Sequence, residues 1–296
     1  MEQRSRPDVV AVVSAYAPDA STLRLLDNTA ALVDRLVVVD DTGGESALSH
    51  VSLFDGIDRV LVVNESNVGL ATALNRGIAT ARDMGARYVL TLDQDTELAA
   101  GFIERLVAHL EAVQREHPDV LVASSATRNG VALPYEHDGD GGRCALGLIQ
   151  SGLLFDVRIF DRLGGFRDDF VIDALEQDFV MRMHQAGLHA TLCPGLDLGH
   201  HIGDQTTVRV FGRTYILSTG HSEQRRYYIT RNQLTWTRQY RAIAPAFARA
   251  GLLWLIWWIG CETVWRVGRR GWIKPFVRGY RDFRRGRMGL YRENWR

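Results

Sequence analysis

The alternation of apolar runs with helical patterns constrains the fold of this chain more than any other feature. Four short runs rich in Val and Leu occupy residues 9–14, 36–39, 60–63 and 88–92. Such runs are typical of strands buried on both faces of a parallel sheet. Segments with apolar residues every three or four positions predict helices at residues 20–36, 70–84 and 102–115. This order predicts an α/β fold with a mostly parallel, Rossmann-like sheet flanked by helices.

Polar side chains follow each of the four predicted strands. They are Ser14 and Tyr16, then Asp40, Asn67, and finally Asp93 with Asp95. Ligands bind beyond the carboxyl ends of the strands in such sheets, so we expect these side chains to share one rim. Asp93 and Asp95 point to the same side if the strand continues. Two close carboxylates repel each other unless a cation lies between them, which predicts a divalent metal carrying a phosphate-bearing substrate. A plain strand-end turn, where Asp is common, is the alternative.

The second half of the chain adds a helix and a pair of histidines. Strands are predicted at 120–123 and 150–155, and a helix is predicted from about Leu175 to Gly187. Glu176 and Asp178 fall in its first turn, where the helix dipole favours acids and where a general base is also well placed. His200 and His201 follow in a Gly-containing loop, either as structural residues or as metal ligands. We interpret residues 203–222 as a mobile lid.

Charge is divided unevenly along a chain whose formal net charge is zero. Residues 205–296 hold 19 basic and four acidic residues, whereas residues 1–204 hold 16 basic and 31 acidic ones. A basic C-terminal part is expected to face phosphate, nucleic acid or an anionic membrane. Arg225 and Arg231, on a helix predicted from Glu223 to about Arg241, are candidates to bind a diphosphate, although a solvated face explains any single Arg equally well.

Residues 250–261 carry no charge and include three Trp. Twelve residues are too few to span a bilayer, which takes roughly 20. With basic residues on both sides, the segment predicts a helix in the interface of an anionic membrane rather than a nucleic-acid contact; a core helix or a dimer interface is the alternative. The three Cys are far apart and the polar N-terminus shows no secretory signal. We therefore expect a cytoplasmic protein, peripheral on the inner face of the cell membrane.

Nine motifs together resemble the inverting family-2 glycosyltransferases of GT-A fold, and within them the rhamnosyltransferase-like group. They lie at residues 13–19, 38–43, 67–77, 92–96, 150–152, 173–182, 200–204, 225–232 and 280–289. The resemblance covers residues 9–289 in the family's order. It implies a nucleotide-sugar-binding half at 1–115, an acceptor-binding half at 116–240 and a helical, membrane-associating extension at 241–296.

The resemblance also implies a role for each candidate site residue. Donor binding falls to Ser14, Tyr16, Asp40, Asn67, Asp93, Arg225 and Arg231. Acceptor binding falls to Ser151, Gly152 and Asp178, and the metal, Mg²⁺ or Mn²⁺, to Asp95 and His200. Glu176 matches the general base, a position usually filled by Asp in relatives. Asp40–Asp41 replaces a more usual Asp-Asn, which leaves open which carboxylate meets the base.

The expected function is metal-dependent transfer of a sugar by single displacement. The resemblance favours L-rhamnose from dTDP-rhamnose and a glycan or polyprenyl-diphosphate-linked acceptor in cell-surface glycan synthesis. The alternatives are a UDP-sugar transferase acting with galactofuranose, glucose or N-acetylglucosamine, a nucleotidyltransferase, and a non-catalytic scaffold docked on the membrane. The sequence leaves the acceptor, the linkage and homo-oligomer formation open.

Overall fold

The computed structural model describes residues 8–46, 54–133, 136–137, 143–144, 148–200, 206–210, 213–218, 220–266 and 271–291. Only the backbone is described at 136–137, 143–144, 200, 206–210, 213–218 and 265–266. The chain forms two compact units: Met1–Arg167 with Glu176–His201, and Asp168–Leu175 with Ile202–Arg296.

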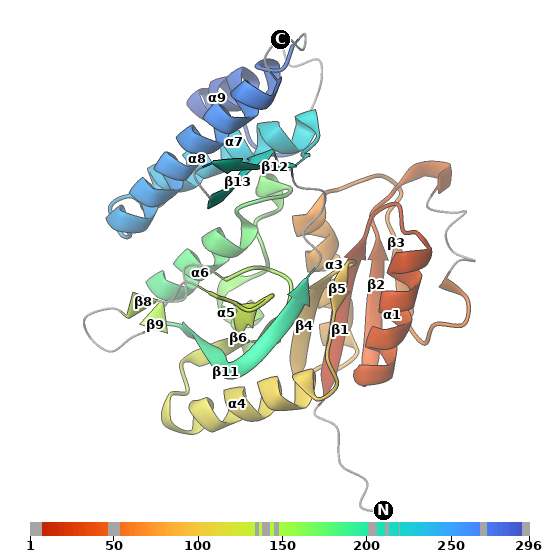
Figure 1. Cartoon of the computed structure of the whole chain (residues 1–296). Helices are drawn as coiled ribbons and strands as arrows, with labels where there is room; N and C mark the ends of the chain where they lie inside the picture. Colours follow the sequence, from red (N-terminus) through yellow and green to blue (C-terminus); the bar gives the residue numbers. More distant parts are fainter. Residues whose placement is uncertain are drawn as a thin grey trace, which may run out of the picture. The chain divides into compact units, whose positions relative to one another are not determined.

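The first unit is built on one mixed sheet (Figure 1). Its main strands lie in the order β3-β2-β1-β4-β10-β6-β11-β5. Their bounds are β1 Val9–Ala15, β2 Arg35–Asp40, β3 Val60–Val63, β4 Tyr88–Asp93, β5 Thr96–Glu97, β6 Val120–Arg128, β10 Leu153–Asp156 and β11 His189–His200. Strands β3, β2, β1 and β4 are mutually parallel, as are β6 and β11, while β10 runs antiparallel between the two groups. The predicted α/β fold is confirmed.

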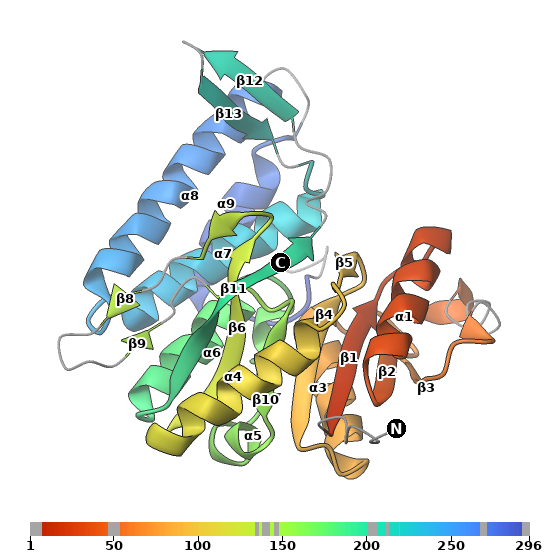
Figure 2. The same ribbon diagram turned by 60° about the horizontal axis from the view of Figure 1, so that its bottom comes forward.

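Helices cover both faces of this sheet. They are α1 Ala20–Leu32, α3 Leu70–Asp83, α4 Phe102–Glu116, α5 Arg158–Leu163 and α6 Leu175–Gln185. Alternate residues of β1 serve the two faces: Val13 packs in the cluster that holds α1 and α4, whereas Val12 meets α3. A Cβ on Gly77 of α3 would lie 2.3 Å from Val12 Cγ1, so the close helix–sheet approach requires glycine there. Figure 2 shows α1 and α4 on the near face and α3 behind the sheet.

The predicted strand at 60–63 is confirmed at its bounds, and the other three N-terminal strands within one or two residues. Strand β11 runs over 12 residues, His189–His200. Pro194 and Gly195 interrupt its apolar pattern, and its pairing with β6 shifts register between Cys193 and Asp197. The bulge accommodates Pro194 and Gly195, which make this strand difficult to predict from the sequence.

The second unit is largely helical, with α7 Glu223–Tyr240, α8 Pro245–Arg266 and α9 Lys274–Arg285. Strands β12 Thr206–Val210 and β13 Arg213–Ser218 form a hairpin inside the segment interpreted as a lid, whose motion stays a prediction. The bounds of α9 within the predicted helical extension were not predicted, although Pro275 in its first turn and Gly286 at its end (φ 65°) are ordinary start and stop signals. Two minor hairpin strands, β8 Glu136–His137 and β9 Arg143–Cys144, and β7 Val131–Ala132 complete the described elements.

Helix α8 has a buried and an exposed apolar face. Leu255 and Trp258 are buried against Ile229 of α7 and Phe276 of α9. Leu253 and Ile256 are each 60% exposed on the opposite side. Among the helices in the described ranges, none is long and apolar enough to cross a bilayer, as twelve uncharged residues led us to expect. The predicted helical extension is confirmed, and its association with a membrane stays a prediction.

Candidate functional site

The carboxyl ends of β1, β2 and β4 bring several of the candidate residues to one rim. The parallel register sets Ser14 beside Asp93 on one side and beside Val39 on the other. Ala15, the next residue, is opposite Asp40. The predicted meeting of Ser14, Asp40 and Asp93 therefore follows directly from strand pairing.

Asp41 holds the loop that carries Asn67. Its Oδ1 accepts hydrogen bonds from Asn64 Nδ2 at 2.8 Å and Val68 N at 2.9 Å, and its Oδ2 accepts one from Gly69 N at 3.0 Å. Burial raises the pKa of Asp41 against the opposing effect of these hydrogen bonds. The Asn67 amide in turn donates to the Asp41 carbonyl at 2.9 Å. Asp41 is thus committed to shaping the loop.

Asp40 is fully buried, and its Oδ1 accepts a hydrogen bond from Thr42 N at 2.9 Å. Thr42 Oγ1 accepts a second bond from Ala17 N at 2.8 Å, which joins the segments that follow β1 and β2. Because Asp41 is engaged with the neighbouring loop, Asp40 stays our assignment for contact with the nucleotide base.

Gln94 ties two sides of the rim together. Its Oε1 accepts a hydrogen bond from Tyr16 N at 2.6 Å, and its Nε2 donates to the Tyr16 carbonyl at 3.2 Å. The Tyr16 side chain itself is 60% exposed. The sequence indicated nothing for Gln94 beyond the spacing of Asp93 and Asp95. Its role becomes visible only when the chain after β1 folds back on the end of β4.

Ser151 holds the Asp93–Thr96 turn in place. Its Oγ accepts a hydrogen bond from Asp93 N at 3.0 Å and lies 2.5 Å from Thr96 Oγ1. Gly152 follows with φ 84°, and a Cβ there would lie 2.7 Å from Leu198 Cδ2. Ser151 is 1% exposed, so these contacts position the turn that carries the carboxylates. A direct contact of Ser151 or Gly152 with the acceptor stays a prediction.

Gln150 belongs to the 150–152 motif, but no role was predicted for it. Its side chain is buried, yet neither Oε1 nor Nε2 has a hydrogen-bond partner among the residues that the structure describes. An unsatisfied buried amide is costly in the free protein and suits a group that a bound hydroxyl can satisfy.

Strand pairing brings the backbones around the metal candidates Asp95 and His200 close together. Strand β5 pairs with the end of β11, which sets His200 opposite Thr96, the residue after Asp95. Carboxylate and imidazole suit Mn²⁺, and the carboxylate suits Mg²⁺. The side-chain types present suit a divalent metal, and metal binding stays a prediction. The side chain of His200 lies outside the described residues, and the described side chains contain no group of three potential ligands.

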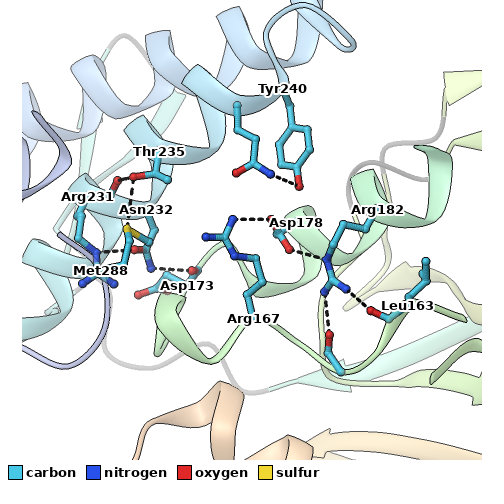
Figure 3. Close-up of polar contacts among 12 residues, drawn as sticks. Leu163, Arg167, Asp173, Asp178, Arg182, Arg231, Asn232, Thr235, Tyr240 and Met288 are labelled. Atoms are coloured by element: carbon cyan, nitrogen blue, oxygen red, sulfur yellow. Dashed lines mark hydrogen bonds and ion pairs between the residues drawn. The ribbon is translucent and has the colours of Figure 1, made fainter. Parts of the chain in front are cut away.

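The two acids of helix α6 differ in their surroundings. Asp178 is fully buried and its Oδ2 accepts from Arg182 Nε at 2.9 Å, while its Oδ1 accepts from Arg167 Nη1 at 3.4 Å (Figure 3). Arg182 also donates to the carbonyls of Leu163 and Gly165, which fixes the helix to the chain after α5. Asp178 thereby anchors the first turn, and its contact with the acceptor stays a prediction. Glu176, one position after the start of the helix, is half-buried.

The two arginines expected at the donor belong to helix α7 of the second unit. Arg225 is 44% exposed and pairs with Asp173 Oδ1 at 3.2 Å. Arg231 is fully buried, and its Nε, Nη1 and Nη2 all donate to groups of this unit. The sequence could not distinguish an Arg that faces phosphate from one that binds main-chain carbonyls. The donor role of both residues stays a prediction.

Comparison with known proteins agrees with the geometry. Residues 11–167, more than half of the chain, match the family model described as glycosyl transferase family 2. The chain is 25% identical over 244 residues to the dTDP-rhamnosyl transferase RfbF of Shigella flexneri, covering 78% of this chain and 80% of that protein.

Two solved structures share the fold. A structure of S. aureus TarS, residues 1–349, gives a TM-score of 0.54 at 13% identity, covering 94% of this chain and 80% of that one. A structure of GalNAc-T7 with UDP, GalNAc and Mn²⁺ gives 0.53 at 12% identity, covering 90% of this chain and 58% of that one. The expected GT-A fold is confirmed. The chain belongs to glycosyl transferase family 2 and is similar to a rhamnosyltransferase within it.

Proposed function

We propose that this glycosyltransferase moves L-rhamnose from dTDP-rhamnose to a lipid-linked or polysaccharide acceptor, with inversion at the anomeric carbon. The observation that carries the proposal is the Asp93–Asp95 turn, which Ser151 and Gln94 hold at the end of β4, next to the ends of β1 and β2. The similarity to a dTDP-rhamnosyl transferase supports the choice of donor.

The donor lies on the rim of the first unit. Ser14, Tyr16, Asp40 and Asn67 receive the nucleoside, and Asp93 lies toward the ribose and diphosphate. Asp95 and His200 would hold Mg²⁺ or Mn²⁺, which when bound neutralises charge on the diphosphate. A glycosyltransferase of the same fold was solved with Mn²⁺, which supports a metal here.

Glu176 is the general base. It takes the proton of an acceptor hydroxyl while that oxygen attacks the anomeric carbon from the face opposite the nucleotide. The bond between the anomeric carbon and the diphosphate oxygen breaks as the new carbon–oxygen bond forms, so the configuration inverts and the nucleoside diphosphate leaves.

The acceptor is bound to the inner face of an anionic membrane, and the second unit docks there from the cytoplasm. Leu253, Trp254, Ile256 and Trp257 expose apolar surface on α8. Lys274, Arg281, Arg284 and Arg285 are exposed on α9, which packs on the same helical core. Exposed Trp together with basic residues suits the interface of anionic lipids.

Flotation with vesicles tests the membrane proposal. We expect the full chain to float with anionic vesicles and not with neutral ones. The double variant Trp254→Ser, Trp257→Ser should lose flotation, whereas the matched control Val131→Ser, which changes an exposed apolar residue of the first unit, should float like the wild type. Equal flotation of all three proteins would contradict membrane docking by α8.

A donor panel tests the sugar. Thermal shift and transfer assays with dTDP-rhamnose, UDP-glucose, UDP-N-acetylglucosamine and UDP-galactofuranose should show stabilisation and turnover with the rhamnose donor. Preference for a UDP-sugar would change the assigned donor and leave the proposed single displacement unaffected. Binding of no donor, by a folded protein, would favour the non-catalytic scaffold.

A further inference from the structure

A strained backbone segment leads directly into the helix that carries Glu176. Val171, Asp173 and Ala174 have positive φ values of 70°, 66° and 64°. They are three of the five non-glycine residues with positive φ in the described ranges. Such conformations are disfavoured for residues with a Cβ, most of all for a β-branched one such as Val171, and persist only where surrounding contacts impose them.

The contacts that impose this conformation come from two adjacent residues of α7. The Asn232 amide nitrogen donates to the carbonyls of Phe170, Ile172 and Asp173, at 2.8, 2.7 and 3.0 Å. Arg231 Nη2 donates to the carbonyls of Asp169 and Phe170, at 3.0 and 3.1 Å. Figure 3 shows Asn232 aimed at the Asp173 backbone. The main-chain oxygens of the strained segment are thus held by two side chains.

The pair is itself locked in place. Arg231 Nε donates to Asn232 Oδ1 at 2.9 Å, and Arg231 Nη1 donates to the Gly289 carbonyl at 2.6 Å. Both side chains are fully buried, so neither exchanges these partners for water. We call Arg231 and Asn232, with the carbonyl groups that they hold, the clamp. The strained segment and α7 belong to the same compact unit, so all contacts of the clamp form within that unit.

We infer that Arg231 and Asn232 are positioning residues for the reaction, because they hold the Val171–Ala174 backbone in the conformation that starts helix α6 at Leu175 and presents Glu176. This inference rests on Glu176 being the general base of the proposed function. It assigns the pair a task in the chemical step, exerted through the main chain. A base displaced by about 1 Å can cost on the order of 100-fold in rate.

The test uses the nearly isosteric variant Asn232→Asp in the full chain. Oδ1 can still accept from Arg231, but the donor to three carbonyls becomes an acceptor. We expect kcat to fall roughly 10- to 100-fold while the donor KM and the affinity for dTDP change less than about twofold. Amide hydrogen exchange across residues 171–177 should become at least about tenfold faster, with no change at residues 91–97.

Two further variants keep the result from being read as general destabilisation. Arg238→Ala removes a cation–π contact with Phe283 from the same helix and should leave both kcat and exchange at 171–177 unchanged. Ala174→Gly in the Asn232→Asp background should recover part of kcat, since glycine adopts positive φ without strain. All proteins are assayed at the same interval below their melting temperatures.

Unchanged exchange at 171–177 in a folded Asn232→Asp protein would overturn the clamp. Faster exchange with unchanged kcat would overturn its task in positioning Glu176. A wild type that is inactive with every donor would instead contradict the proposed function, and the exchange measurement would still decide whether the clamp exists.

Discussion

The Asp93–Thr96 turn and the Asp168–Leu175 segment reach defined conformations by different means. The turn extends a buried strand, so the register of β4 with β1 largely places it, and single side chains such as Ser151 and Gln94 complete it. The second segment has no strand partner and adopts disfavoured backbone angles under the clamp of Arg231 and Asn232. The first region is therefore expected to tolerate the loss of one support, and the second is not.

Substitution of the proposed base should give the largest effect. We expect Glu176→Gln to lower kcat about 10²- to 10⁴-fold, because the amide cannot take the proton of the acceptor hydroxyl. Affinity for the nucleotide, measured by calorimetry, should change little, since the proposed donor site lies on the other region. Normal turnover would show that the strained segment does not serve a base at Glu176.

Asp95→Ala tests the proposed binding of a metal by the Asp93–Thr96 turn. Loss of a metal-binding carboxylate should abolish metal-dependent binding of the nucleotide sugar, seen in calorimetry as a fall on the order of 100-fold or more. A chelator should have the same effect on the wild type and no further effect on the variant. If neither the substitution nor the chelator changes the affinity for the donor, the proposal of a bound metal is contradicted.

Gln94→Leu tests whether the Asp93–Thr96 turn tolerates the loss of one support, because it removes the Gln94 hydrogen bonds and leaves the strand register intact. Two hydrogen bonds to the Tyr16 backbone are lost, each contributing about 0.5–1.5 kcal/mol. Nucleotide affinity should weaken about 5- to 30-fold, with kcat at saturating donor nearly unchanged. A fall in kcat as large as that of Asn232→Asp would erase the difference between the two regions.

Gln150→Met tests the unsatisfied amide beside the turn. Removing two buried polar atoms without partners should raise the free energy of unfolding by about 1 kcal/mol, measured by denaturant titration. The KM for the acceptor should rise severalfold if a substrate hydroxyl satisfies this amide. A less stable variant with normal kinetics would mean that the amide has internal partners instead.

The smallest expected effect concerns His221, in the second unit. Burial, with a further contribution from Arg225, lowers the pKa of His221 from 6.5 to about 4. The unfolded chain then binds a proton between these values and the folded chain does not, so stability is complete above about pH 6.5 and falls toward pH 4. The drop in melting temperature between pH 6.5 and 5 should shrink in His221→Gln, while Asn232→Asp retains it.

The same contrast explains how far the sequence could be interpreted. Runs such as Leu36–Val39 predict buried strands, and parallel strands bring their ends together, so the shared rim of Ser14, Asp40 and Asp93 followed from the sequence. That this rim binds a donor stays a prediction. Gln94 received no role, and Ser151 was assigned to the acceptor rather than to the turn, because their hydrogen-bond partners lie 55 to 78 positions away. Arg231 was expected at a phosphate, and only the folded chain reveals that its nitrogens meet carbonyl groups. Nothing local predicts positive φ at Val171.

The anomeric configuration of the product decides whether transfer is a single displacement with Glu176 as base. Wild-type enzyme, dTDP-rhamnose, a divalent metal and a rhamnose-accepting glycan are combined, and the anomeric configuration of the new linkage is read by NMR. One base and one displacement predict a linkage of configuration opposite to that of the donor, and its loss in Glu176→Gln. A product that retains the donor's configuration would contradict single displacement with Glu176 as base.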